Sequence, residues 1–235
     1  MFEKIKGFTL GEVMLAMALL GFLATLTLRT VGTAVQHNTR NAEFKTAYSK
    51  LDLALKSVLA EHSVAGSCYA CPTEDDAKKY GLNINGTCTA KTNCETLEKY
   101  IVKELGVIKT CNNESDDSCI PPRYRTSTDC FKDFSKGKSF IMSNGMIIIT
   151  DDDKSFTQFA IDVNGKKGPN QWGEDVFTLA VTASDTTLSG STLIVNDVSV
   201  LPPSACLLGS NGKGGKSSAV MLEEIANYKA PKKND

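Results

Sequence analysis

The chain has 235 residues, of which 41% are hydrophobic and 23% charged, and its formal net charge is −1. This length suits one globular domain with an additional segment, and the near-neutral charge argues against a dominant nucleic-acid-binding surface, which would make the chain strongly basic. Both histidines, His37 and His62, fall in a stretch predicted below to be helical, so the globular part has no histidine for a Ser-His or Cys-His catalytic pair.

The N-terminal segment is basic at first and then apolar. Lys4 and Lys6 precede residues 10–28, which form a 19-residue apolar run with a single charge at Glu12. A helix of that length spans about 28 Å, close to the ~30 Å hydrocarbon core of a bilayer. A secretory signal peptide would have a shorter apolar region followed by a small-residue cleavage site. The run therefore predicts a transmembrane segment at residues 10–28, with the leading lysines on the cytoplasmic side.

Glu12 is unusual for its place in the predicted span. A carboxylate inside an apolar span costs a few kcal/mol and is a functional hypothesis by default. The alternative is that Glu12, only three residues into the run, extends to the membrane surface. The residues alone leave both readings open.

The segment Lys6-Gly7-Phe8-Thr9-Leu10-Gly11-Glu12-Val13 resembles the K-G-F-T-L-I-E signature of type IV pilins and type II secretion pseudopilins. The resemblance implies cleavage by prepilin peptidase after Gly7 and N-methylation of the new terminus, Phe8. It also implies that Glu12 pairs with the N-terminal amine of a neighbouring subunit during assembly. Gly11, where the family usually has Ile or Leu, departs from the signature without touching the cleavage site or the glutamate.

This resemblance also implies a location and partners. The subunit would be a single-pass inner-membrane protein with a periplasmic globular domain, and would enter a periplasmic or extracellular filament after assembly. Its partners would be other pilin subunits, prepilin peptidase and the inner membrane, with nucleic acid not expected.

A long N-terminal helix is predicted because no proline occurs before Pro72. Beyond residue 40, apolar residues recur at spacings of three and four, which is typical of a helix with one face on a core. These are Phe44, Ala47, Tyr48, Leu51, Ala54, Leu55, Val58 and Leu59. The chain therefore divides into a leader at 1–7, a helix at 8–61 and a globular domain at 62–235.

The globular domain ends in strand-like patterns. Residues 140–143 and 146–150 flank Asn144-Gly145, which predicts a hairpin with a type I′ turn. Further strands are predicted at 156–163, 175–182 and 192–200. The expected fold class is α+β, with a long N-terminal helix, its first half transmembrane, packed on an antiparallel sheet. The resemblance implies the same arrangement, a pilin-like ladle.

Eight cysteines are crowded mainly into residues 66–135, a loop-rich region with one predicted helix at 96–107. They are Cys68, Cys71, Cys88, Cys94, Cys111, Cys119, Cys130 and Cys206. An even number in such a region predicts disulfides formed in an oxidising compartment, in any of 105 connectivities. Zinc is the alternative, but only Cys68 and Cys71 have ligand spacing, and no second C-x-x-C follows.

The loop from residue 162 to 175 is a candidate calcium site. Asp162, Asn164 and Asp175 supply side-chain oxygens among glycines, and Ca²⁺ takes six to eight oxygen ligands. The spacing is not that of an EF-hand. Lys166 and Lys167 disfavour a dication, and turn residues that bond to their own backbone are the alternative. No other cofactor is expected.

Residues 210–217 imitate a phosphate-binding loop, but Ser210 stands where the first glycine is required. They predict a loop before a short C-terminal helix at 218–228. With no nucleophile–base pair in the chain, we expect no enzyme. The expected function is that of a structural subunit of a type IV pilus or type II secretion pseudopilus. The alternative is a minor or tip pilin that binds DNA or a surface.

Overall fold

The structure is a computed structural model of the chain. It describes residues 9–62, 67–112, 119–120, 137–150, 156–190, 192–202 and 216–227, without the side chains of 27–37 and 192–193. The backbone divides into two compact units, Met1–Arg40 and Asn41–Asp235.

Helix α1 comprises Leu10–His62, which is 53 residues. Its part within the second unit is amphipathic as predicted, and Phe44, Leu51 and Leu55 have no solvent-exposed surface. These side chains belong to the main core cluster, together with residues of the sheet. Burial of each such side chain contributes roughly 1.5–3 kcal/mol, so this half of the helix is held by packing more than by its own propensity.

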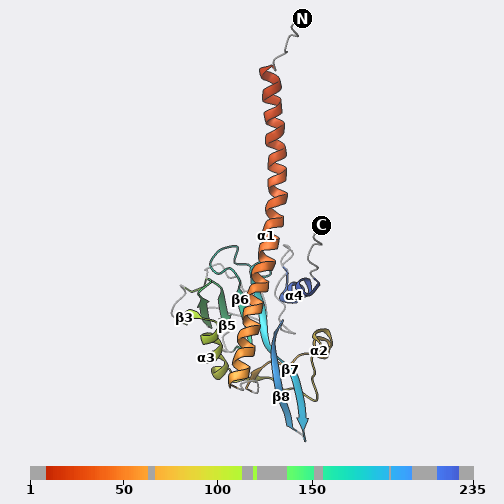
Figure 1. Cartoon of the computed structure of the whole chain (residues 1–235), viewed down its shortest axis with the longest axis vertical. Helices are drawn as coiled ribbons and strands as arrows, with labels where there is room; N and C mark the ends of the chain where they lie inside the picture. The colour runs from red at the N-terminus through yellow and green to blue at the C-terminus, as the bar shows by residue number, and fades with distance from the viewer. Residues whose placement is uncertain are drawn as a thin grey trace, which may run out of the picture. The chain divides into compact units, whose positions relative to one another are not determined.

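The main sheet is antiparallel and has six strands. They are β3 (Val107–Asn112), β4 (Lys138–Met142), β5 (Ile147–Thr150), β6 (Gln158–Asp162), β7 (Val176–Ser189) and β8 (Thr192–Leu201). Their order in space is their order in sequence, so among the described residues β3 and β8 are the two edge strands. With helices segregated from an antiparallel sheet, the second unit has α+β architecture (Figure 1).

Both faces of the sheet are buried near its middle. Ile148 belongs to the main core under α1, whereas Ile147 and Ile149 belong to a second cluster with Ala160 and Val176. Successive strand residues point to opposite faces, so these two clusters lie on opposite sides of the sheet. This explains why all four residues of β5 are buried instead of alternating.

Smaller elements surround the sheet. A two-stranded ladder pairs β1 (Cys68–Tyr69) with β2 (Lys91–Thr92). Helix α2 (Glu74–Tyr80) follows β1, α3 (Glu95–Glu104) precedes β3, and α4 (Ser218–Asn227) ends the described chain. The helices predicted at 96–107 and 218–228 are therefore present within a few residues, while α2, β1, β2 and β3 were not predicted.

The transmembrane assignment of residues 10–28 is wrong, and with it the single-pass inner-membrane location. In the described part of the chain, no helix combines the length and the apolarity needed to cross a membrane. The predicted span also contains a carboxylate at Glu12, and a charge inside an apolar segment costs a few kcal/mol.

The β4–β5 hairpin is present, but its turn differs from the prediction. Gly145 has φ +88°, whereas Asn170 is the one non-glycine residue with positive φ in the described ranges, so Asn144 does not adopt a type I′ conformation. Gly145 N donates to Met142 O, and Met142 N donates to Met146 O, both at 2.9 Å. This is a three-residue loop closed by a glycine in the left-handed region, the next most common hairpin connection.

Candidate assembly site

The start of α1 is closed by a reciprocal cap between Thr9 and Glu12. The Thr9 backbone N and Oγ1 both donate to Glu12 Oε2 at 2.9 Å, and Glu12 N donates to Thr9 Oγ1 at 3.4 Å. This is a capping box, which satisfies backbone N–H groups that have no partner within the helix. The T-x-x-E spacing was readable in the sequence, so Thr9 is a site residue that sequence reasoning missed.

The cap also affects the charge of Glu12. The Thr9 backbone N–H and then its hydroxyl lower the pKa of the Glu12 carboxyl below its usual value, so the group is ionised at neutral pH. All three hydrogen bonds of the cap use Oε2 or the threonine hydroxyl. Oε1 takes part in none of them and has the lone pairs to accept a further donor.

Residues 9–26 are exposed without exception. Large apolar side chains here have exposed fractions between 41% and 80%. They are Leu10, Val13, Met14, Leu15, Met17, Leu19, Leu20, Phe22, Leu23 and Leu26. Since successive helical residues are about 100° apart, they project in every direction around the axis. A contiguous apolar surface of this kind marks a site that other molecules cover.

Gly7 and Phe8, the predicted processing site, lie outside the described residues. Cys130 and Cys206 lie outside them as well. The other six cysteines form three disulfides, Cys68–Cys94, Cys71–Cys88 and Cys111–Cys119. The prediction of disulfides is thus confirmed for these six residues, and such bridges are typical of proteins that fold in an oxidising compartment.

The candidate calcium residues lie in one hydrogen-bonded loop between β6 and β7. Asp162 and Asp175 have no exposed surface. Asp162 Oδ1 accepts the backbone N–H groups of Asn164 and Gly165, at 3.2 and 2.8 Å. The two Asp175 oxygens accept those of Asn170 and Gln171, at 2.8 and 2.7 Å. Three of the four carboxylate oxygens therefore already hold the loop's own backbone.

The rest of this loop also binds within itself. With its amide nitrogen turned inward, Asn170 donates to Asp162 Oδ2 at 3.2 Å and to Gly165 O at 3.0 Å. Gly165 has φ +69°, and a Cβ there would collide with Gly145 O in the β4–β5 turn. Asn164 Oδ1 is buried without a hydrogen bond among the described residues. Across the part of the chain that the structure describes, no group of three or more His, Cys, Asp or Glu residues could hold a metal ion. Calcium binding by this loop stays a prediction.

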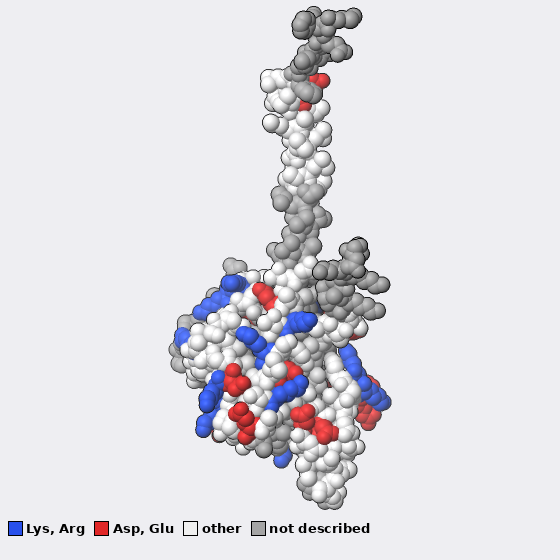
Figure 2. All heavy atoms as spheres, in the orientation of Figure 1, with Lys and Arg blue, Asp and Glu red and all other residues white. Residues whose placement is uncertain are grey.

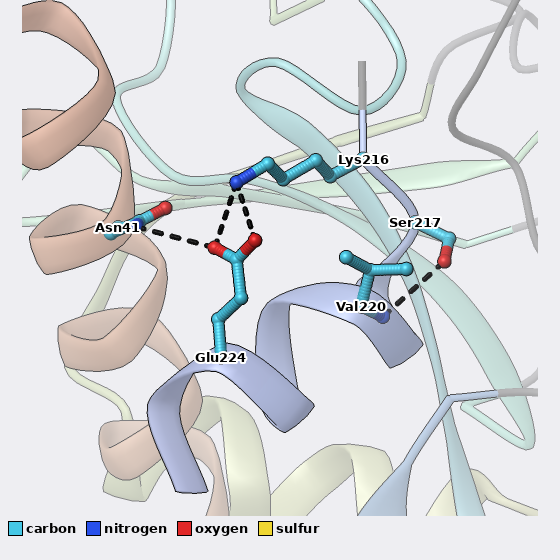
Figure 3. Close-up of polar contacts among 5 residues, drawn as sticks. All are labelled: Asn41, Lys216, Ser217, Val220 and Glu224. Atoms are coloured by element: carbon cyan, nitrogen blue, oxygen red, sulfur yellow. Dashed lines mark hydrogen bonds and ion pairs between the residues drawn. The ribbon is translucent and has the colours of Figure 1, made fainter. Parts of the chain in front are cut away.

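The lysine of the glycine-rich segment is paired within the second unit. Lys216 Nζ lies 2.6 and 2.8 Å from the two carboxylate oxygens of Glu224 on α4 (Figure 3). Asn41 of α1 reaches the same carboxylate at 3.4 Å, and Ser217 Oγ accepts the Val220 N–H at the start of α4. Lys216 thus forms an ion pair with the C-terminal helix. This pair explains the position of the lysine without a phosphate ligand.

Charges of both signs are interspersed over the face of the second unit drawn in Figure 2. By contrast, residues 9–26 contain Glu12 as their one charged residue. The features that distinguish the first unit are therefore its uniform apolar surface and one capped carboxylate. The chain matches no protein-family model, no curated protein and no solved structure.

Proposed function

We propose that this chain is a structural filament subunit of the type IV pilus or type II secretion pseudopilus kind, assembled through the N-terminal part of α1. The observation that carries the proposal is the all-round exposure of apolar side chains over residues 10–26. An amphipathic helix presents an apolar stripe of about 100° to one partner surface. A helix that is apolar on every side needs several neighbours, which the centre of a helical filament of identical subunits supplies.

The second support is Glu12. Cleavage after Gly7 would create an amine at Phe8, directly before the Thr9 cap. A carboxylate enclosed by packed apolar helices needs an opposite charge, because an unpaired buried charge costs about 3–5 kcal/mol. The Phe8 amine of a neighbouring copy supplies that charge, and Glu12 Oε1 is the atom that accepts it.

The test separates the charge of Glu12 from its capping role. Glu12→Gln keeps a capping acceptor, since Gln serves at this position of a capping box, but removes the charge. Glu12→Ala removes both, and Thr9→Ala removes the capping hydroxyl while keeping the carboxylate. Subunit abundance and incorporation into sheared filaments are measured separately for each variant.

We expect all three subunits to accumulate, because the cap lies outside the core of the second unit and is worth about 1 kcal/mol locally. Both Glu12 variants should associate at least about 100-fold more weakly than wild type, and Thr9→Ala should assemble. Normal incorporation of Glu12→Gln would show that the glutamate only caps its helix. The absence of wild-type filaments would overturn the proposal itself.

Processing provides an independent test. The mature chain should begin at N-methylated Phe8, detected by intact-mass and N-terminal peptide mass spectrometry of protein from the native host. A mature chain beginning at Met1, or beyond residue 25, would contradict cleavage after Gly7.

A further inference from the structure

A preformed hollow lies in the second unit, in a segment that pairs with β7 through Asn83. It has a volume of about 460 Å³ and is open to solvent. Its apolar lining comes mainly from Pro72, Ala77, Leu82 and Ile84, together with the disulfide between Cys71 and Cys88. A hollow of this size accommodates a large side chain and its neighbours.

The walls of the hollow are fixed by covalent and hydrogen bonds. Besides the disulfide, Asn83 N donates to Ser184 O and Asn83 O accepts from Thr186 N, both at 2.9 Å. Asn85 N donates to Thr186 Oγ1 at 2.7 Å. The segment is therefore tied to β7 and need not reorganise to accept a partner, which saves the ordering cost that weakens many interfaces.

The opposite edge of the sheet presents an apolar side chain. Ile108 lies in β3 at a break in the β3–β4 register, between the paired residues Val107 and Lys109. A bulge of this kind re-aims the extra side chain, and Ile108 is 69% exposed. Since β3 is one edge strand of the described sheet and the segment of the hollow pairs with β7, next to the other edge strand, the two features lie toward opposite edges of the sheet.

The surroundings of the two features have complementary charge. Lys103, Glu104 and Lys109 lie in the segment that carries Ile108, with a basic excess. At the hollow, helix α2 carries Glu74, Asp75 and Asp76 against Lys78 and Lys79, an acidic excess of one charge. Surfaces with opposite excess charge select each other and fix their orientation.

We propose that Ile108 of one copy inserts into the 71–88 hollow of a second copy. The contact uses two different surfaces, so a bound pair still offers one free hollow and one free Ile108, and the arrangement can extend without limit. This inference rests on the proposed filament function and adds a contact between globular units to the one between N-terminal helices.

The test is site-specific photocrosslinking of the full-length chain. p-Benzoylphenylalanine replaces Ile108 in one copy, and a second copy carries a heavy isotope label, so that a mixed crosslink is intermolecular. The probe should crosslink to residues 71–88 of the labelled copy. The matched control places the probe at Leu53, which is 67% exposed on α1 and lies outside the proposed contact.

Substitutions give a second measurement. Ile108→Asp, and Ala77→Phe within the hollow, should each weaken association by about tenfold or more, whereas Leu53→Asp should not. Crosslinks from position 108 to another segment or to a different protein would overturn the inference, and so would the absence of any crosslink. Filaments without the 108 crosslink would refute this contact alone, and the crosslink without filaments would refute the filament proposal alone.

Discussion

At the scale of single residues, the most constrained groups are two carboxylates without solvent exposure, Asp162 and Asp175. Each accepts hydrogen bonds from backbone N–H groups of its own loop. In a strand these N–H groups would donate to a neighbouring strand, which the loop does not have. Buried anions persist where such donors converge on them. The loop between β6 and β7 is therefore held by its own hydrogen bonds.

Asp175→Ala should lower the free energy of unfolding by about 2–5 kcal/mol, because it leaves two backbone donors without an acceptor. Asp175→Asn keeps one acceptor and should lose less. Urea unfolding at neutral pH measures both free energies. The control is Glu104→Ala at an exposed position, whose free energy of unfolding should stay within about 0.5 kcal/mol of wild type. A loss for Asp175→Ala no larger than that of the control would show that the loop does not depend on this carboxylate.

Calcium binding by the same loop is tested by ligand linkage. A cation that binds only the folded state raises its stability in proportion to the logarithm of its concentration. Since three carboxylate oxygens already accept backbone N–H groups, we expect the same melting temperature in chelator and in excess CaCl₂. A rise that is lost in Asp162→Asn would instead establish a calcium site.

At the scale of elements, a hydrogen bond from Tyr48 joins α1 to the edge strand β8. Its hydroxyl donates to Val200 O of β8 at 2.9 Å. Burial, and then the nearby Asp52 and Tyr80, raise the pKa of Tyr48 to about 12. The protonated phenol is thus favoured by the folded state, because it keeps the donated hydrogen bond and avoids a partly buried anion.

This shift predicts a loss of stability in alkali. The unfolded tyrosine ionises near pH 10, below the folded value, so the stabilisation from Tyr48 is complete below pH 10 and is lost as the pH rises toward 12. Unfolding free energies measured from pH 8 to 11.5 should fall more steeply for wild type than for Tyr48→Phe. Parallel curves for the two proteins would contradict the assignment. At neutral pH the variant should lose about 0.5–1.5 kcal/mol.

Several of the helices and strands could be predicted from the sequence. The periodic stripe of α1 from Phe44 onward and the strands after residue 138 were predicted, since burial imposes their spacing directly. Helix α2 was missed because it has no buried residue. Its signals were nonetheless present, with Thr73 capping Asp76 N and Gly81 ending the helix at φ +66°.

Other features could not be predicted because they depend on tertiary contacts. Strand β3 is mostly exposed and lacks an alternating pattern, so only its pairing with β4 defines it. Within the candidate site, Glu12 was identified from its neighbours in sequence, whereas its cap by Thr9 was missed although the T-x-x-E spacing indicates it. The predicted span rested on hydropathy and length alone, and no helix in the described part of the chain combines the length and apolarity needed to cross a membrane.

At the scale of the whole molecule, the described disulfides cross-link the region between α1 and β4. Three bridges account for six of the eight cysteines, which leaves Cys130 and Cys206. We predict that these two form the fourth bridge, closing a loop of 76 residues (206 minus 130). Peptide mapping without reduction should recover the Cys130–Cys206 peptide and no free thiol.

Loop length should rank the contributions of the bridges. By chain entropy, replacing Cys130 and Cys206 with serine should cost about 4–5 kcal/mol, against about 2.5 kcal/mol for Cys111 and Cys119, whose separation is eight residues. Thermal unfolding of the two double variants compares them directly. Equal losses, or free thiols at positions 130 and 206 in the wild type, would contradict the fourth bridge.

The bulged isoleucine on β3 also gives the assembly a direction of growth. A row of copies joined through Ile108 and the 71–88 hollow ends in an unfilled hollow on one side and an unpaired isoleucine on the other. A subunit with Ile108→Asp keeps its hollow, so it can join the end that presents an unpaired isoleucine. It then has no isoleucine to insert into the hollow of the next subunit. A small fraction of this variant among wild-type subunits should therefore act as a chain terminator and shorten filaments far more than its share of the protein. Filament length measured by electron microscopy against the fraction of variant checks this, and a length independent of that fraction would mean that growth proceeds through other contacts.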